Sequence, residues 1–281
     1  MDFLDFPDRL WLWLAALSYT IAFALAIGAV LRSQAHSRTA LFILVAVGFI
    51  LQTTGLYQRG LINGGCPLGN KFEVIQFLVW SVTVLFLVVG PAFRLSLLGF
   101  FTSGLITVLA IVSLLVPSWD SVQRSSLFSD NPWIELHAAI GMFSYGAFAL
   151  LALTSAMFIL QNISLKQKHF SRLSRLLPSI VELEQINLRL LVFGTVLLSL
   201  SLGIGFYTQS MGPETIDASK FAGTSLVWLA YMIILAIRRF RLLGSSLLAA
   251  ICIAVFGLAL LTLGPVSRSG MDRGETEVTA P

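Results

Sequence analysis

Residues 131–160 read NPWIELHAAIGMFSYGAFALLALTSAMFIL, a nearly unbroken apolar run that holds one histidine, His137. An α-helix needs about 20 apolar residues to cross the hydrocarbon core of a bilayer. This stretch therefore predicts a transmembrane helix over 133–161, long enough to tilt or to project from the membrane. The chain has only three histidines, so one of them near the start of such a helix needs an explanation.

The rest of the chain has the composition of a membrane protein. Of its 281 residues, 57% are hydrophobic and 11% are charged, and the mean hydropathy is +0.87. A soluble domain carries about 25% charged residues, so this chain lacks the polar surface to cover a globule in water. We predict an all-α, polytopic membrane helix bundle with about eight spans. The predicted spans are 10–31, 40–57, 72–90, 95–116, 133–161, 187–206, 221–238 and 243–264.

These spans define one integral membrane domain over 1–264 and a disordered polar tail over 265–281. The N-terminal stretch MDFLDFPDR lacks both a basic region and a small-residue cleavage site, so we expect an uncleaved first span. No CxxC motif is present, and Cys66 and Cys252 fall at different predicted depths. A disulfide between them is therefore not expected.

Basic residues are concentrated on one side of this topology. If the N-terminus lies outside, eleven of the eighteen Lys and Arg residues fall on the inner side, and the positive-inside rule then puts both termini outside. Segment 162–185 is predicted to be a basic inner loop, or alternatively an amphipathic segment that lies on the inner membrane surface. The eleven residues are Arg32, Arg38, Arg94, Lys166, Lys168, Arg172, Arg175, Arg189, Arg238, Arg239 and Arg241.

Ionisable residues of potential function gather near the predicted outer side. Glu73 begins the third span, His137 lies near the start of the fifth, and Asp217 and Lys220 flank the start of the seventh. Ionisable groups inside a bilayer are costly, so they usually mark a functional site or a close pair. The two other histidines, His36 and His169, are predicted on the inner side.

The third span begins with GNKFEVIQFLVW, residues 69–80, which supports two interpretations of Glu73. Asn70 can cap the helix, and Glu73 three residues later completes a capping box. Alternatively, Glu73 shares a helical stripe with Gln76 (or Phe77) and Trp80. Such a stripe of carboxylate, amide and indole is expected to face protein or an aqueous pocket rather than lipid.

In the fifth span His137, Gly141 and Ser144 share one helical face of small and polar residues. Glu135 points to the other side, so it is not expected to orient the imidazole. His137 either bonds to a neighbouring helix or offers a neutral imidazole to a metal. In the seventh span Asp217 is a candidate N-cap, and Trp228 lies at a depth where aromatic residues usually serve packing.

Together, residues 69–80, 133–150 and 217–231 resemble the cytochrome c assembly family, the haem-handling membrane proteins of the CcsA and CcmC type. NKFEVIQFLVW is similar to the family pattern Asn-x-aromatic-Glu-x6-Trp, and WIELHAAIGMFSYGAFAL resembles a Leu-His segment followed by Ser-Tyr and small residues. The resemblance covers about residues 65–265 and is greatest to short, eight-span, HemX-like members. The matching residues are Asn70, Phe72, Glu73, Trp80, His137, Ser144, Tyr145, Asp217, Lys220, Trp228 and Tyr231.

The resemblance implies that haem is the cofactor and that His137 is a ligand of the haem iron at the outer face. The residues that it implies as cofactor contacts are Glu73, Trp80, His137, Asp217, Lys220 and Trp228. Where the family has a Trp-rich loop, this chain has FYTQSMGPETIDASKF, residues 206–221, without tryptophan. The predicted outer side holds one histidine, so a bis-histidine site within one chain is not expected, and Met211 is a candidate second ligand.

No nucleophile–base pair and no metal triad is visible, so we do not expect an enzyme. The first hypothesis is a haem-handling protein of cytochrome c biogenesis in a bacterial inner (plasma) membrane. The second is a membrane scaffold or regulator that partners an assembly subunit or a haem-biosynthesis enzyme, and the third is a small-molecule transporter. Expected partners are the lipid bilayer, haem and another cytochrome c assembly subunit. The net charge of +4 is explained by inner loops and does not indicate nucleic-acid binding.

Overall fold

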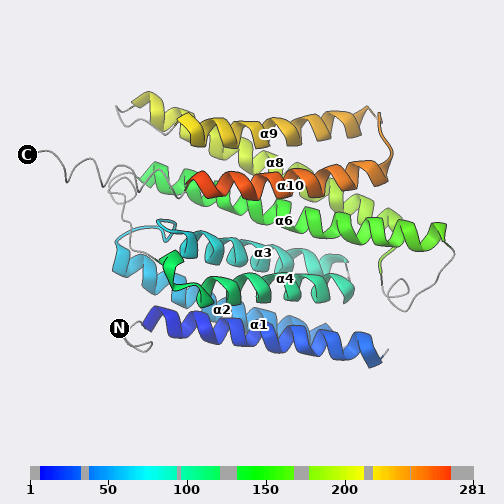
Figure 1. Cartoon of the computed structure of the whole chain (residues 1–281), viewed down its shortest axis with the longest axis horizontal. Helices are drawn as coiled ribbons and strands as arrows, with labels where there is room; N and C mark the ends of the chain where they lie inside the picture. Colours follow the sequence, from blue (N-terminus) through cyan, green and yellow to red (C-terminus); the bar gives the residue numbers. More distant parts are fainter. Residues whose placement is uncertain are drawn as a thin grey trace, which may run out of the picture.

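The protein is an elongated bundle of long α-helices (Figure 1). The computed structural model describes residues 7–32, 38–93, 96–120, 132–167, 177–211, 218–240 and 242–266, and within these ranges there is no strand. One short 3-10 helix, η1 (Pro117–Asp120), follows the fourth helix. The long helices are α1 (Pro7–Arg32), α2 (Arg38–Asn63), α3 (Lys71–Phe93), α4 (Ser96–Leu115), α6 (Pro132–Lys166), α8 (Ile180–Met211), α9 (Ala218–Arg239) and α10 (Ser245–Val266).

Seven of the described helices are long and apolar enough to cross a membrane, and α10 adds a shorter apolar stretch, Ser245–Leu260. Apolar runs fold as helices in a bilayer because a helix satisfies its backbone hydrogen bonds internally. The predicted all-α membrane bundle is therefore confirmed. The start of α1 and the end of α10 lie at the same end of the bundle, at the left of Figure 1.

We call this end the predicted outer end. It also holds the starts of α3, α6 and α9 and the ends of α2, α4 and α8 (Figure 1). Glu73 and His137 thus lie at one end of the molecule, as predicted. Its placement outside the membrane stays a prediction from the positive-inside rule.

The two ends of segment 162–185 belong to the long helices, and its middle, residues 168–176, lies outside the described residues, so its prediction as an inner loop or surface segment stays a prediction. Helix α6 continues through Lys166, and α8 begins at Ile180 rather than at 187. The early start has a local cause, because Ser179 and Glu182 form a reciprocal capping box. The Glu182 N–H donates to Ser179 Oγ over 3.2 Å, and the Ser179 N–H donates to Glu182 Oε2 over 3.1 Å.

The helices pack as two halves, with α1 to α4 in one and α6, α8, α9 and α10 in the other. The contact between α3 and α6 provides most of the packing between the halves (Figure 1). Gly146 makes this approach possible, because a Cβ at this position would lie 2.6 Å from Ser81 Cβ. Small residues permit such close helix packing in membranes, where no hydrophobic driving force brings helices together.

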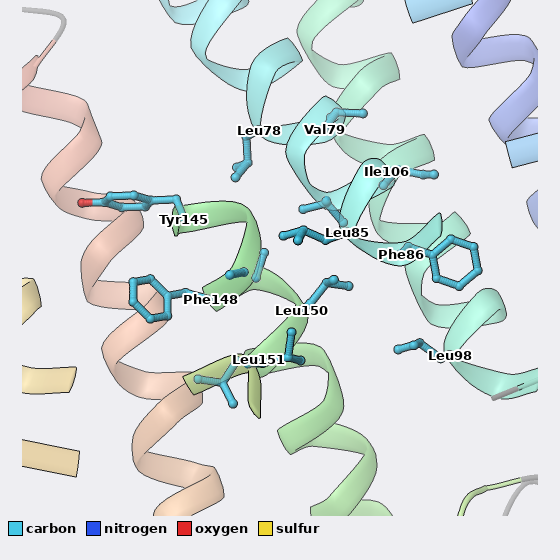
Figure 2. Close-up of a cluster of buried hydrophobic side chains, with 14 of the residues drawn as sticks. Leu78, Val79, Leu85, Phe86, Leu98, Ile106, Tyr145, Phe148, Leu150 and Leu151 are labelled. Carbon is cyan, nitrogen blue, oxygen red and sulfur yellow. The ribbon is translucent and has the colours of Figure 1, made fainter. Parts of the chain in front are cut away.

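The interior around this contact is apolar, with buried side chains from α3, α4 and α6 (Figure 2). Tyr145 and Phe148 project from one side of α6, and Leu150 projects from the other side towards α3 and α4 (Figure 2). Tyr231 of α9 is fully buried and stacks on Phe148, with ring centroids 3.7 Å apart and planes 7° from parallel. Tyr231 therefore serves helix packing.

Candidate functional site

His137 lies in the second turn of α6, where its half-buried imidazole contacts α8. Its Nδ1 is 2.6 Å from the backbone carbonyl oxygen of Ser201 and 3.1 Å from Ser201 Oγ. The Ser201 hydroxyl donates back to the His137 carbonyl oxygen over 2.8 Å. The predicted bond between His137 and a neighbouring helix is therefore confirmed.

Glu135 points away from the imidazole, as predicted. Its Oε1 accepts a hydrogen bond of 3.0 Å from the Cys66 backbone N–H, in the loop between α2 and α3. Burial raises the pKa of the Cys66 thiol to about 11, and the nearby carboxylates of Glu135 and Glu73 add to this increase. Cys66 is thus expected to react slowly at neutral pH, and both it and Cys252 are free, as expected.

The imidazole of His137 fits a site that takes one nitrogen ligand. A carbonyl oxygen can only accept a hydrogen bond, so Nδ1 carries the proton and the lone pair of the neutral ring is on Nε2. Among the described residues Nε2 has no hydrogen-bond partner. Metal-ligating histidines usually have this arrangement, in which the second ring nitrogen donates to a carbonyl or carboxylate.

A metal cage built from protein side chains does not fit the described part of the chain. Those residues contain no group of three or more His, Cys, Asp and Glu side chains that could hold a metal ion. Within the described residues His137 therefore offers one nitrogen to a metal, as the histidine ligand of a haem iron does.

An aromatic pair lies beside the histidine on the same two helices. Trp133 is one helical turn before His137, and its ring meets that of Tyr207 of α8 edge to face, with centroids 6.1 Å apart. Both rings are about half exposed, at 52% and 47%. They offer flat apolar surface at the predicted outer end. Trp133 lies near His137 on α6, and Tyr207 lies near Ser201 on α8.

Glu73, a predicted cofactor contact, lies in a buried ionic cluster instead of an open site. Its backbone N–H donates to Asn70 Oδ1 over 2.9 Å, which confirms the capping interpretation. Its Oε2 accepts from the Gly69 N–H over 2.7 Å, and its Oε1 lies 2.6 Å from Nε of Arg59. The side chain is 3% exposed.

Arg59 of α2 is the centre of this cluster. Besides Glu73, it pairs with Asp8 of α1 over 2.9 Å and with Asp120 of η1, which also binds Arg9 over 2.8 Å. The cluster therefore joins α1, α2, α3 and η1 at the predicted outer end. The guanidinium groups of Arg9 and Arg59 also lie over the Phe72 ring, 5.4 Å and 4.8 Å from its centroid.

The stripe of Glu73, Gln76 and Trp80 faces protein, as predicted. Gln76 is buried and accepts from Gln52 of α2 over 2.9 Å, while its own amide donates to Ser113 of α4 over 2.9 Å. Trp80 is half-buried, and its indole N–H donates to Thr53 Oγ1 of α2 over 2.9 Å. The stripe thus ties α3 to α2 and α4.

Trp228 of α9 contacts α8. Its indole N–H donates to Ser199 Oγ over 2.7 Å, two residues from the serine that holds His137. Trp228 and His137 are therefore linked to one short stretch of α8, whereas Glu73 and Trp80 are held by α2. The predicted contacts do not form a single cluster in the described residues.

Asp217, Lys220 and Met211 lie in or beside the loop between α8 and α9. Asp217 lies outside the described residues, and so do the two other histidines of the chain, His36 and His169. Lys220 is in the first turn of α9 and Met211 ends α8, but their side chains are outside the described set. Their roles stay predictions.

The sequence analysis did not predict the residues that contact Glu73 and His137 or support those contacts. Arg59 is a lone arginine at the end of an apolar run, and such a charge is expected to be paired. Ser201 and Gly205 repeat the four-residue spacing of His137 and Gly141, which is typical of two small faces that pack together. Asp8 and Asp120 gave no local signal, because their partners are far away in the chain.

Comparisons with known proteins place these features in a family context. A model of the cytochrome C assembly protein family matches residues 68–268. Protein HemX of Brevibacillus brevis is 32% identical over 192 residues, which are 68% of this chain and 70% of that protein. Protein HemX of Bacillus subtilis (strain 168) is 28% identical over 245 residues, 83% of this chain and 87% of that protein. Cytochrome c biogenesis protein CcsA of Cyanidium caldarium is 25% identical over 111 residues, 38% of this chain and 36% of that protein.

Proposed function

Because this chain belongs to the cytochrome c assembly protein family, we propose that it acts in cytochrome c biogenesis by binding or presenting haem at the outer face of the membrane. It is a multi-pass membrane protein, and its bacterial HemX relatives favour a bacterial inner membrane. We do not assign it an enzymatic activity. Its role is to hold a cofactor and to give it up to a partner.

The geometry of His137 is the observation that carries this proposal. The Nδ1–H donates to the Ser201 carbonyl, and Nε2 has no partner among the described residues. Haem, when bound, would supply a flat apolar ring system and an iron that takes a nitrogen ligand. His137 would hold the iron through Nε2, and Trp133 and Tyr207 would cover apolar surface beside it.

The other predicted contacts divide into a framework and a loop. Glu73, Trp80 and Trp228 bond to protein groups, so in this proposal they shape the outer end rather than touch the cofactor. Asp217 belongs to the loop between α8 and α9, which would cover the site, and Lys220 lies in the first turn of α9 beside it. A second ligand of the iron would come from Met211 or from another cytochrome c assembly subunit.

The absorption spectrum of the purified protein tests the proposal. Protein expressed with ample haem is expected to show a Soret band, and His137→Ala should shift it or remove most of it. His36→Ala and His169→Ala are matched controls that should keep the band, because both histidines are predicted at the other end. An unchanged band in the His137 variant would exclude this residue as a ligand.

A second function, a membrane scaffold or regulator without haem, is favoured by a separate observation. Glu73, Trp80 and Trp228 are all engaged within the bundle, so fewer groups remain for a cofactor. Such a protein would work through a partner, either an assembly subunit or a haem-biosynthesis enzyme. It would co-purify with that partner and carry no pigment under haem-replete expression.

A further inference from the structure

We propose that Ser201 and Gly205 of α8 are positioning residues for His137, which fix the proton on Nδ1 and present Nε2 as the only ligating atom. This inference rests on the proposed function for its use, because it states how the histidine is prepared for a metal. The positioning itself, however, is a property of the protein without any cofactor.

The first step concerns the proton. The Ser201 carbonyl oxygen lies 2.6 Å from Nδ1 and has no hydrogen to donate. The only hydrogen bond possible between them has Nδ1 as donor, which selects one of the two neutral tautomers. The lone pair is then on Nε2, the nitrogen without a partner among the described residues.

The second step concerns rigidity. Ser201 Oγ donates to the His137 carbonyl oxygen over 2.8 Å, while the imidazole of His137 donates to the Ser201 carbonyl. Each residue thus uses its side chain to bind the backbone of the other. The bond from Nδ1 holds the ring against α8, and the bond from Ser201 Oγ holds the backbone of α6 at the same residue, without any group from the cofactor.

The third step concerns space. A Cβ built on Gly205 would lie 2.8 Å from Cε1 and 2.9 Å from Nδ1 of His137. These distances are too short for non-bonded atoms, so any other residue at 205 would push the ring away from the Ser201 carbonyl. The glycine therefore opens one face of α8 to the imidazole.

Gly203 supplies a matched control on the same helix. A Cβ built on Gly203 meets no atom within 4 Å. Gly203→Ala and Gly205→Ala make the same chemical change two residues apart, with the same gain in helix propensity. Only the second should displace His137.

The tautomer can be measured directly in protein without haem. A His36→Gln, His169→Gln variant keeps His137 as the single histidine, and ¹⁵N-labelled histidine in lipid-reconstituted protein gives the ring nitrogens separate NMR signals. We expect a protonated Nδ1 and an unprotonated Nε2 at a pH where the ring is neutral. A protonated Nε2, or an even mixture of tautomers, would overturn the proposal without any further variant.

Substitutions in α8 test how this helix fixes the tautomer of His137. Gly205→Ala should lose the single-tautomer spectrum and weaken haem binding by about 10- to 100-fold, the usual effect of removing an outer-shell partner. Gly203→Ala should keep both. Ser201→Ala retains the carbonyl, so it should keep the tautomer. Equal spectra for the two glycine variants would contradict the role of Gly205.

The outcomes also separate this inference from the proposed function. If the single tautomer is present but the protein binds no haem, the positioning holds and the haem-binding function fails. If haem binds through His137 while the free ring shows the other tautomer or a mixture, the function holds and the positioning fails.

Discussion

The chemistry of His137 depends on a backbone atom of another helix. A carbonyl oxygen at position 201 would be present whatever residue stood there, so no sequence pattern could reveal it as the partner of Nδ1. What the sequence did indicate was the small face of His137, Gly141 and Ser144, which predicted contact with a helix. The identity of that helix as α8 needed the structure.

Single residues also show which contacts of the site could be predicted from the sequence and which could not. The capping role of Glu73 could be predicted because Asn70 is three residues away, and local spacing encodes local bonds. The pairing of Glu73 with Arg59 could not, because it depends on how α2 and α3 pack. Asp217 and Lys220 stay predictions from the family resemblance.

At the residue scale, the Cys66 thiol should react unusually slowly. Burial and the carboxylates of Glu135 and Glu73 raise its pKa to about 11, from an ordinary value near 9. At pH 8 the thiolate fraction is then about 100-fold lower than for an ordinary thiol, since each unit of pKa changes it tenfold. Alkylation with iodoacetamide in a Cys252→Ala background, followed by mass spectrometry from pH 7 to 11, measures this rate.

Glu135→Gln tests the cause of this shift. The amide oxygen still accepts from the Cys66 N–H but carries no charge, so the pKa of Cys66 should fall and alkylation at pH 8 should become faster. A rate for the parent protein equal to that of a free thiol peptide would show that the thiol is not shielded.

At the scale of the helices, their boundaries could be predicted from local sequence, but the helices against which they pack could not. Eight helices could be predicted because long apolar runs are separated by short polar segments. The start of α8 was placed too late because the capping box of Ser179 and Glu182 lies in a polar stretch that hydropathy alone assigns to a loop. The contacts of η1 had no sequence signal at all.

Among the charged residues that link helices, Arg59 is expected to be the one whose replacement lowers stability most. It pairs with Asp8, Glu73 and Asp120, and its side chain is 11% exposed. Arg59→Met leaves buried carboxylates without their partner, which typically costs about 3–5 kcal/mol of stability. Thermal unfolding in detergent, followed by tryptophan fluorescence, should show a large decrease in Tm.

Arg9→Met is the matched control for this change. Arg9 pairs only with Asp120 among the described acidic residues, and both side chains are 14% exposed. Its loss leaves Asp120 bound to Arg59, so the decrease in Tm should be clearly smaller. Equal decreases for the two variants would mean that Arg59 is not the centre of the cluster.

On the scale of the whole molecule, the family region depends on helices that lie before it. The family match begins at residue 68, after α1 and α2. Those two helices nevertheless supply Asp8 and Arg59, which hold the start of α3, and Gln52, which holds Gln76. The first half of the predicted outer end therefore depends on helices outside the family match, whereas His137 and its α8 partners belong to the second half.

The joint between the halves yields the last prediction. Gly146 of α6 lies so close to Ser81 of α3 that a Cβ would be 2.6 Å from Ser81 Cβ, 3.1 Å from its carbonyl carbon and 3.2 Å from the Val82 nitrogen. Two of these atoms are backbone, so the helices must separate to admit a larger residue. Gly146→Val should therefore lower stability by about 1–3 kcal/mol or more, as overpacking does.

Gly257→Val in α10 provides the comparison, because a Cβ there meets nothing within 4 Å. Both variants add a β-branched residue to a membrane helix, so a difference in Tm between them isolates the α3–α6 contact. Ser81→Gly should restore only part of the stability of Gly146→Val, since the backbone contacts remain. An unchanged Tm for Gly146→Val would show that the halves are not held at this crossing, and full rescue by Ser81→Gly would show that the backbones can separate freely.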